Sequence, residues 1–257
     1  MVAAATGILA RIAAHKRAEL PGVRACRAEL ERKATDRNPA RDFRAVLHDG
    51  AIIAEIKKAS PSRGILAENF NPVEIAKTYA RGGAAALSVL TDREFFQGSL
   101  EDLQAARASV AIPVLRKDFT LDEVHVIEAA AHGADAILLI AALLDGRELR
   151  DFRELAAKFG MAALVEVHDA DELRAAIDSG ADIAGVNNRD LNTFETRLET
   201  SLKLAGSFPD NCRRIAESGI GSKQDIERLR AAGFDAFLIG EHLMKSPDAA
   251  AALRALR

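Results

Sequence analysis

The chain has 257 residues, a formal net charge of −3 and only two cysteines. So small a charge argues against nucleic acid or an anionic membrane as a partner, and an anionic ligand must be bound by local cations and backbone donors. Cys26 and Cys212 lack metal-ligand spacing, which argues against a disulfide framework or a zinc site and fits a reducing cytosol. The apolar runs are too short for a signal peptide or a membrane span. We therefore expect a cytoplasmic protein.

Residues 1–48 precede the first predicted strand and are predicted to be helical. Ile8, Ile12, Leu20 and Leu30 lie on the apolar faces of these helices. Because a barrel can close without this segment, we interpret it as an N-terminal helical extension that packs on the barrel and covers one of its ends. No linker-like stretch follows, so residues 49–257 are predicted to complete a single domain, 1–257.

From residue 49 onwards, short aliphatic runs alternate with amphipathic helical stretches, which is the repeat of a βα unit. The eight predicted strands are at 52–56, 85–90, 113–116, 136–140, 163–167, 183–186, 214–216 and 236–239. Continuous aliphatic runs are typical of parallel strands covered by helices. The pattern therefore predicts an α/β fold, a (β/α)8 TIM barrel. A doubly wound open sheet is disfavoured because no GxGxxG follows the first strand.

Cap residues predict where the intervening helices begin and end. Asn71, followed by proline, begins one helix, and Gly83 ends it. Thr120 is predicted to precede a helix that ends at Gly133. A glycine two residues before an aspartate recurs ahead of three strands, at 133–135, 180–182 and 233–235. This repeat predicts the same helix-to-strand turn three times.

Polar residues interrupt the aliphatic runs at the carboxyl ends of the strands, where the active sites of (β/α)8 barrels lie. Glu55 and Lys57 are two residues apart and therefore on one face of the first strand. Further polar strand ends are Arg116-Lys117-Asp118, Glu166, Asn187 and Glu217. Buried charges are costly unless they are paired, so we expect these groups to pair with one another and with a polar ligand. Ordinary rim salt bridges are the alternative, disfavoured because both signs recur at one edge.

The last two strands are followed by glycine-rich loops. Ser218-Gly219-Ile220-Gly221-Ser222 runs directly into a helix, and Gly240-Glu241 opens the next turn. Loops at these two positions, together with a helix N-terminus, commonly form the phosphate site of such barrels. The sequence therefore predicts a phosphate site there and a phosphorylated small molecule as the partner.

These segments are also the ones that carry a family resemblance. The segments IIAEIKKASPSRG, PVLRKDF, LVEVHD, GVNNRDL, IAESGI and FLIGEHLM each fall at a predicted strand end. In order and spacing the chain resembles the indole-3-glycerol-phosphate synthase family over nearly its full length. The resemblance implies a lyase of tryptophan biosynthesis that uses no metal or organic cofactor. It would convert 1-(2-carboxyphenylamino)-1-deoxyribulose 5-phosphate into indole-3-glycerol phosphate, carbon dioxide and water.

The resemblance also implies roles for the catalytic residues. Lys117 would be the general acid for ring closure and Glu166 the general base. Lys57 would contact the substrate carboxylate or phosphate and assist the dehydration as an acid. Glu55 would hold and tune Lys57.

The remaining roles concern binding. Asn187 and Glu217 would position the substrate hydroxyls and the glutamate–lysine network, Arg189 would fix the sixth-strand loop, and Ser60 would lie near the carboxylate. The expected phosphate ligands are Ser218, Gly219, Gly240 and Glu241. The expected contacts of the aromatic ring are Phe96, Phe119 and Ile140.

One departure and two alternatives stand beside this interpretation. Glu241 occupies a position where the family often has serine, so we expect its side chain to point away from the phosphate. The first alternative is another sugar-phosphate barrel, either an isomerase or an aldolase that uses Lys117 as a Schiff-base nucleophile without a close carboxylate. A non-catalytic phosphometabolite-binding barrel would bind without turnover. We expect a monomer or a weak homo-oligomer.

Overall fold

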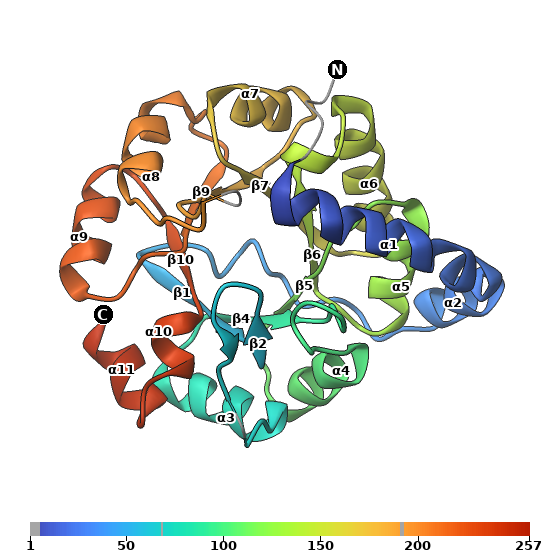
Figure 1. Cartoon of the computed structure of the whole chain (residues 1–257), viewed down its shortest axis with the longest axis horizontal. Helices are drawn as coiled ribbons and strands as arrows, with labels where there is room; N and C mark the ends of the chain where they lie inside the picture. The colour runs from blue at the N-terminus through green and yellow to red at the C-terminus, as the bar shows by residue number, and fades with distance from the viewer. Residues whose placement is uncertain (1–5, 68, 191–192) are drawn as a thin grey trace.

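A computed structural model describes residues 6–67, 69–190 and 193–257 of the chain. Eight parallel strands form a closed barrel in the order β1-β10-β9-β8-β7-β6-β5-β4 (Figure 1). The strands are β1 Ala51–Ile56, β4 Ala86–Leu90, β5 Val114–Lys117, β6 Ala136–Ile140, β7 Ala162–Val167, β8 Ile183–Asn187, β9 Arg213–Glu217 and β10 Ala236–Ile239. The predicted (β/α)8 barrel is confirmed, and each predicted strand matches to within one residue at either end.

Helices surround the barrel, as Figure 1 shows. They are α3 Pro72–Gly82, α4 Leu100–Ser109, α5 Glu123–Ala131, α6 Gly146–Lys158, α7 Ala170–Asp178, α8 Glu199–Leu204, α9 Lys223–Ala231, α10 Glu241–Met244 and α11 Ala249–Ala255, with short 3-10 turns at Ala141–Leu143 and Ala205–Ser207. Their apolar faces cover the barrel, which is why the strands read as continuous aliphatic runs. In the described ranges, no helix is both long and apolar enough to cross a membrane.

The predicted helix boundaries hold at most positions. The side chain of Asn71 accepts the backbone N–H groups of Val73 and Glu74 at the start of α3, and Gly83 ends that helix at φ 93°. The prediction at Thr120 is wrong by two residues. Asp122 caps α5 instead, because its carboxylate accepts the N–H of Val124.

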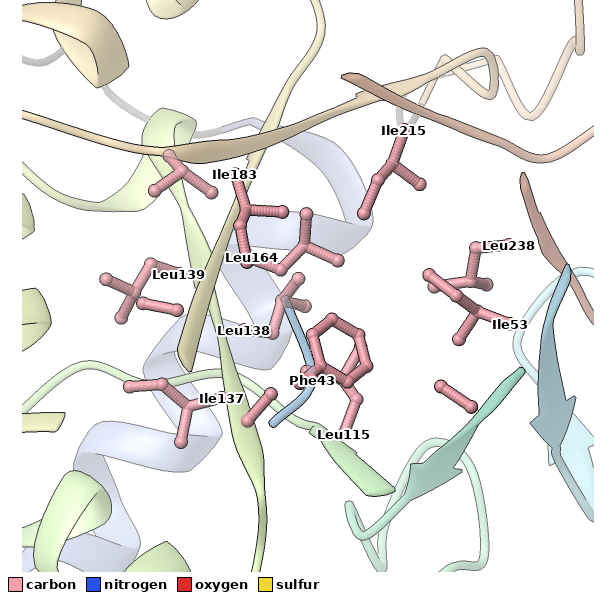
Figure 2. Packing of buried hydrophobic residues seen from close by; sticks show 14 of the residues in the cluster. Phe43, Ile53, Leu115, Ile137, Leu138, Leu139, Leu164, Ile183, Ile215 and Leu238 are labelled. Carbon is pink, nitrogen blue, oxygen red and sulfur yellow. The ribbon is translucent and has the colours of Figure 1, made fainter. Parts of the chain in front are cut away.

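The N-terminal extension is helical only in part. It forms α1 Gly7–Ala25 and α2 Arg27–Thr35, whereas the prediction of helix up to residue 48 is wrong. In the irregular segment that follows, the side chains of Phe43 and Leu47 are fully buried, and Phe43 lies in the barrel interior. Figure 2 shows the ring of Phe43 beside Leu115 and Leu138. This segment therefore fills the end of the barrel opposite the strands' carboxyl ends. Residues 1–5 of the extension lie outside the described residues.

The loop after β1 contains a feature that the aliphatic pattern does not predict. Two short antiparallel strands, β2 Ala59–Ser60 and β3 Gly64–Ile65, form a hairpin over the carboxyl end of the barrel. Each strand is only two residues long, so it carries no alternation of apolar and polar residues. This hairpin places Ser60 and Arg63 at the rim of the barrel.

Candidate active site

A cavity of about 880 Å³ lies at the carboxyl ends of the strands. All the predicted site residues line it: Glu55, Lys57, Ser60, Phe96, Lys117, Phe119, Ile140, Glu166, Asn187, Arg189, Glu217, Ser218, Gly219, Gly240 and Glu241. They come from all eight strands of the barrel or the loops that follow them. The barrel brings together residues that are up to 186 positions apart in the sequence, because its parallel strands all end at one edge.

Lys117 stands at the centre of the cavity floor, between two carboxylates. Its Nζ donates to Glu166 Oε2 at 2.5 Å and to Glu217 Oε2 at 3.0 Å. Asn187 Nδ2 donates to the other oxygen of Glu166 at 3.0 Å. Strand register produces this arrangement, because Asn187 and Glu217 are direct neighbours on β8 and β9. The cluster thus holds a cation that can donate a proton beside a carboxylate that can accept one.

Burial and charge set the protonation states in this cluster. Burial alone would lower the pKa of Lys117, but the charges of Glu166 and Glu217 outweigh it and raise that pKa. Burial would raise the pKa of Glu166, but the charge of Lys117 outweighs it and lowers the pKa to about 2. For Glu217, burial dominates and raises the pKa to about 7. At neutral pH, Lys117 is therefore protonated and Glu166 is ionised.

A second acid–base pair lies at the end of β1. Lys57 Nζ donates to Glu55 Oε1 at 2.5 Å, which confirms the predicted contact on one face. Gly240 packs against Glu55 so closely that a Cβ there would collide with the carboxylate. Gly185 on β8 leaves the same kind of space for the carboxylate of Glu217. Two glycines therefore make room for two buried glutamates.

The loop after β9 has backbone geometry that favours glycine. Ser218 and Gly219 have φ angles of 66° and 76°. A Cβ on Gly219 would lie 2.5 Å from Cγ2 of Thr196. Asn188 Nδ2 donates to the Ser218 carbonyl at 3.1 Å and holds the loop from the neighbouring strand. The loop leads into α9, whose first turn is capped by Ser222.

Glu241 is surrounded by cations. Its carboxylate lies 3.1 Å from Arg63 Nε, 3.2 Å from Arg189 Nη2 and 2.6 Å from Lys245 Nζ. The side chain therefore joins the loop hairpin after β1 to the loop after β8. Leu191, at the end of the NNRDL segment in that loop, lies outside the described residues.

One wall of the cavity is apolar. The rings of Phe96 and Phe119 are 6.1 Å apart between centroids. Ile140 at the end of β6 extends this wall. Helix α1 adds Ile8 and Ile12, which the sequence placed on apolar packing faces, and Leu9, which it did not single out. Apolar residues with helical spacing look the same whether they face a barrel or a ligand cavity, so the sequence held no signal for this role.

A buried lysine fixes α1 over the cavity. Lys16 Nζ lies 3.1 Å from Asp118 Oδ1 and 3.7 Å from Asp92 Oδ2. Arg116, which the strand-end pattern included, does not line the cavity and instead pairs with Asp118 at 3.0 Å. Alternation along β5 explains this, because residues 116 and 117 point to opposite faces of the barrel wall.

This fold and this cavity define a (β/α)8-barrel enzyme with its acid–base groups facing one substrate-sized space. Comparisons with known proteins identify the family. The family model described as indole-3-glycerol phosphate synthase matches residues 9–256. A Koribacter versatilis protein of that name is 52% identical over 89% of each chain. Another from Roseiflexus sp. strain RS-1 is 48% identical over 97% of each chain. The chain belongs to the indole-3-glycerol phosphate synthase family, whose members are carboxy-lyases.

Solved structures with low sequence identity share the fold. A structure titled as KGPDC from Streptococcus mutans has a TM-score of 0.61 at 14% identity and covers 80% of this chain and 95% of its own. Thiamine phosphate pyrophosphorylase from Pyrococcus furiosus has a TM-score of 0.61 at 19% identity, covering 84% of this chain and 96% of its own. These likenesses concern the barrel alone.

Proposed function

We propose that this chain carries out the reaction for which its family is named. It closes, decarboxylates and dehydrates 1-(2-carboxyphenylamino)-1-deoxyribulose 5-phosphate to give indole-3-glycerol phosphate. The observation that carries the proposal is the buried Lys117, held between Glu166 and Glu217 at the floor of a cavity with an apolar wall. This cluster supplies an acid and a base where the substrate's ring and ketose carbons would meet.

Lys117 serves as the acid of the ring-closing step. The ring carbon that bears the carboxylate attacks the C2 carbonyl, and Lys117 donates a proton to the carbonyl oxygen as negative charge develops there. Loss of carbon dioxide then returns an electron pair to the ring. The neighbouring carboxylates favour the protonated lysine before the reaction starts, which is the state this step requires.

Dehydration needs a second acid and a base. Lys57 donates the proton with which the hydroxyl group leaves as water, while Glu55 keeps the ammonium group in place. Glu166 removes the proton from C1, and it is ionised and hydrogen-bonded to Asn187 in the free enzyme. Glu217 positions Lys117 from the opposite side.

Different parts of the cavity bind the phosphate, the aromatic ring and the carboxylate of the substrate. Ser218, Gly219, Gly240 and Glu241 bind the phosphate mainly through backbone N–H groups, and the cations around the Glu241 side chain offset its charge. Phe96, Phe119 and Ile140 pack against the aromatic ring. Ser60 lies near the substrate carboxylate, and Arg189 fixes the loop after β8.

The geometry disfavours Schiff-base chemistry at Lys117. An aldolase lysine must lose its proton to act as a nucleophile, and two carboxylates within 3.0 Å hold this one in the charged form. We infer a cytosolic setting from the two separate free thiols, Cys26 and Cys212.

The direct test mixes the purified protein with the carboxyphenylamino-deoxyribulose phosphate and follows indole fluorescence. The chain has no tryptophan, so the protein adds little emission in the range where the indole product fluoresces. Continuous formation of the indole product is the expected result. A folded protein that binds the substrate and releases no indole would contradict the proposal.

A further inference from the structure

The proposed reaction has a proton balance that the active site must meet. The carbonyl oxygen of the substrate leaves as water and so gains two protons. The substrate itself gives up only one, from C1, because the carboxylate departs as carbon dioxide without releasing a proton. Each turnover therefore takes up one proton from solvent. On the proposed function, Lys117 and Lys57 each give up a proton and Glu166 gains one, so the site needs one more proton per cycle than the substrate returns to it.

His168 lies directly behind Glu166. The two residues are two positions apart at the end of β7, and His168 Nε2 is 3.6 Å from Glu166 Oε1. On the other side of the ring, Nδ1 is 3.0 Å from Glu172 Oε2 at the start of α7. Glu172 also accepts the backbone N–H of His168 at 2.7 Å. The imidazole thus stands between a buried carboxylate and a carboxylate nearer the surface.

One nitrogen of this ring is left without a hydrogen bond. Nε2 of His168 is buried and makes no hydrogen bond to any residue that the structure describes. Because a buried polar atom of this kind costs free energy, its orientation toward Glu166 calls for an explanation other than stability.

The ring also faces a second, separate space. A cavity of about 510 Å³ is lined by His168, Glu172, Asn187 and Arg189 among others. His168 does not line the substrate cavity, whereas Asn187 and Arg189 border both. Glu166 lines only the proposed substrate site, and His168 lines only the second, polar cavity, which is large enough to hold water. The contact between the two side chains therefore links the two spaces.

Three carboxylates determine the protonation of the ring. Burial alone would lower the pKa of His168, but the hydrogen bond with Glu172 and the charges of Glu166 and Glu217 outweigh it and raise the pKa. These carboxylates come from α7, β7 and β9. The ring therefore takes up a proton more readily than a free histidine does.

We propose that His168 relays protons from the second cavity to Glu166 while substrate fills the first. A proton that Glu172 takes from water enters the ring at Nδ1 as the Nε2 proton leaves for Glu166 Oε1. A turn of the carboxyl group brings the proton from Oε1 to Lys117, whose Nζ contacts Glu166 at 2.5 Å, and restores the acid. Glu166 is then free to accept the proton from C1. After product leaves, Glu166 releases that proton to solvent and Lys57 regains one, so the net uptake is one. A flip of the ring returns the starting tautomer. His168 thus acts through Glu166 and touches no substrate.

The test measures kcat of His168→Asn at pH 8 while the concentration of imidazole buffer is raised at constant ionic strength. We expect kcat to fall by about tenfold, less than the loss for a residue that acts directly on substrate, and to recover as imidazole supplies the proton. KM stays unchanged because His168 lies outside the substrate cavity. At pH 6 the deficit shrinks, because protons are more abundant.

Two further variants make the outcome decisive. His48→Asn is the matched control, since His48 also contacts a carboxylate, Asp49, but is exposed and precedes β1 at the far end of the barrel. It should match the wild type. Glu172→Gln changes only the outer end of the relay, and it should show the same dependence on buffer as His168→Asn.

The failures of the two proposals are distinguishable. If the wild type forms indole and both relay variants are insensitive to buffer, whether slow or fast, the relay is wrong and the proposed function stands. If the wild type forms no indole, the proposed function itself fails.

Discussion

Two networks of buried charge lie at opposite ends of the barrel, and they differ in what completes them. At the end away from the cavity, Asp135 accepts the backbone N–H groups of Arg41 and Val114 at 2.8 and 2.9 Å and the guanidinium of Arg107 at 2.9 Å. At the cavity, Lys117 and Glu166 depend on other side chains alone. The hydrogen bonds of the first network are completed by backbone groups, whereas the second network lines the cavity.

This difference separates structural charge from functional charge. Backbone partners cannot move without disturbing the fold, so Asp135 joins β5, β6 and the N-terminal extension rigidly. Side-chain partners can exchange protons and accept a ligand between them. The contrast predicts that substitutions at one end reduce the rate and at the other end reduce the stability.

The largest expected effect is on kcat at the cavity. Glu166→Gln keeps the shape and the Asn187 contact but removes the base, so kcat should fall by about 10²- to 10⁴-fold. Lys117 keeps its ion pair with Glu217 in this variant, so the melting temperature should fall less than in Asp135→Asn. Steady-state kinetics and a thermal melt on one preparation check both statements, and a kcat within threefold of the wild type would remove Glu166 from its proposed role.

The next effect is on stability at the opposite end. Asp135→Asn leaves Arg107 without its ion-pair partner and places an N–H group against backbone donors. We expect a loss of about 3 to 5 kcal/mol in the free energy of unfolding, as for breaking a buried pair. Denaturant titration measures it. The folded protein should keep its kcat. A lower kcat in a fully folded Asp135→Asn protein would contradict the distinction between the two networks.

Ser218 sharpens the comparison within the cavity itself. Ser218→Ala keeps the backbone N–H but removes the hydroxyl, a second donor to the phosphate that the ground state and the transition state share. KM should therefore rise by up to about tenfold, the value of one hydrogen bond to a charged group. Initial rates over a range of substrate concentrations give both constants. A loss mainly in kcat would instead place Ser218 with the acid–base groups.

The smallest effect concerns pH. Burial raises the pKa of Glu217 to about 7, so the folded state binds this proton more tightly than the unfolded state. The resulting stabilisation is present at pH 4 and is lost as pH rises through 7. Glu217→Gln has no such proton. Between pH 5 and 8 its melting temperature should therefore rise relative to that of the wild type. Each 1 kcal/mol of difference in unfolding free energy between the two proteins shifts their melting temperatures apart by about 2 to 4 °C in a chain of this size. A constant difference would contradict the raised pKa.

The strand ends were predictable because one physical rule places them. An aliphatic run predicts a buried strand, and parallel strands in a closed barrel end at one edge, so Lys117, Glu166 and Glu217 had to lie close together. The pairing of Glu55 with Lys57 followed from their spacing alone.

Other features depend on contacts that no local pattern encodes. Ile8 and Ile12 read as packing residues, yet α1 lies across the cavity because Lys16 reaches Asp118, 102 positions away. Nε2 of His168, which makes no hydrogen bond within the described residues, takes its position from the packing of β7 against α7. Phe43 fills the barrel end from a segment without regular structure, so periodicity predicted helix there instead.

The central claim is that the Lys117 cluster performs the chemistry, and one measurement tests it most directly. In the indole fluorescence assay, Lys117→Ala should remain folded at the assay temperature and bind the substrate while kcat falls by about 10²-fold or more. Indole formation within threefold of the wild-type rate would contradict the claim and would require another acid for ring closure.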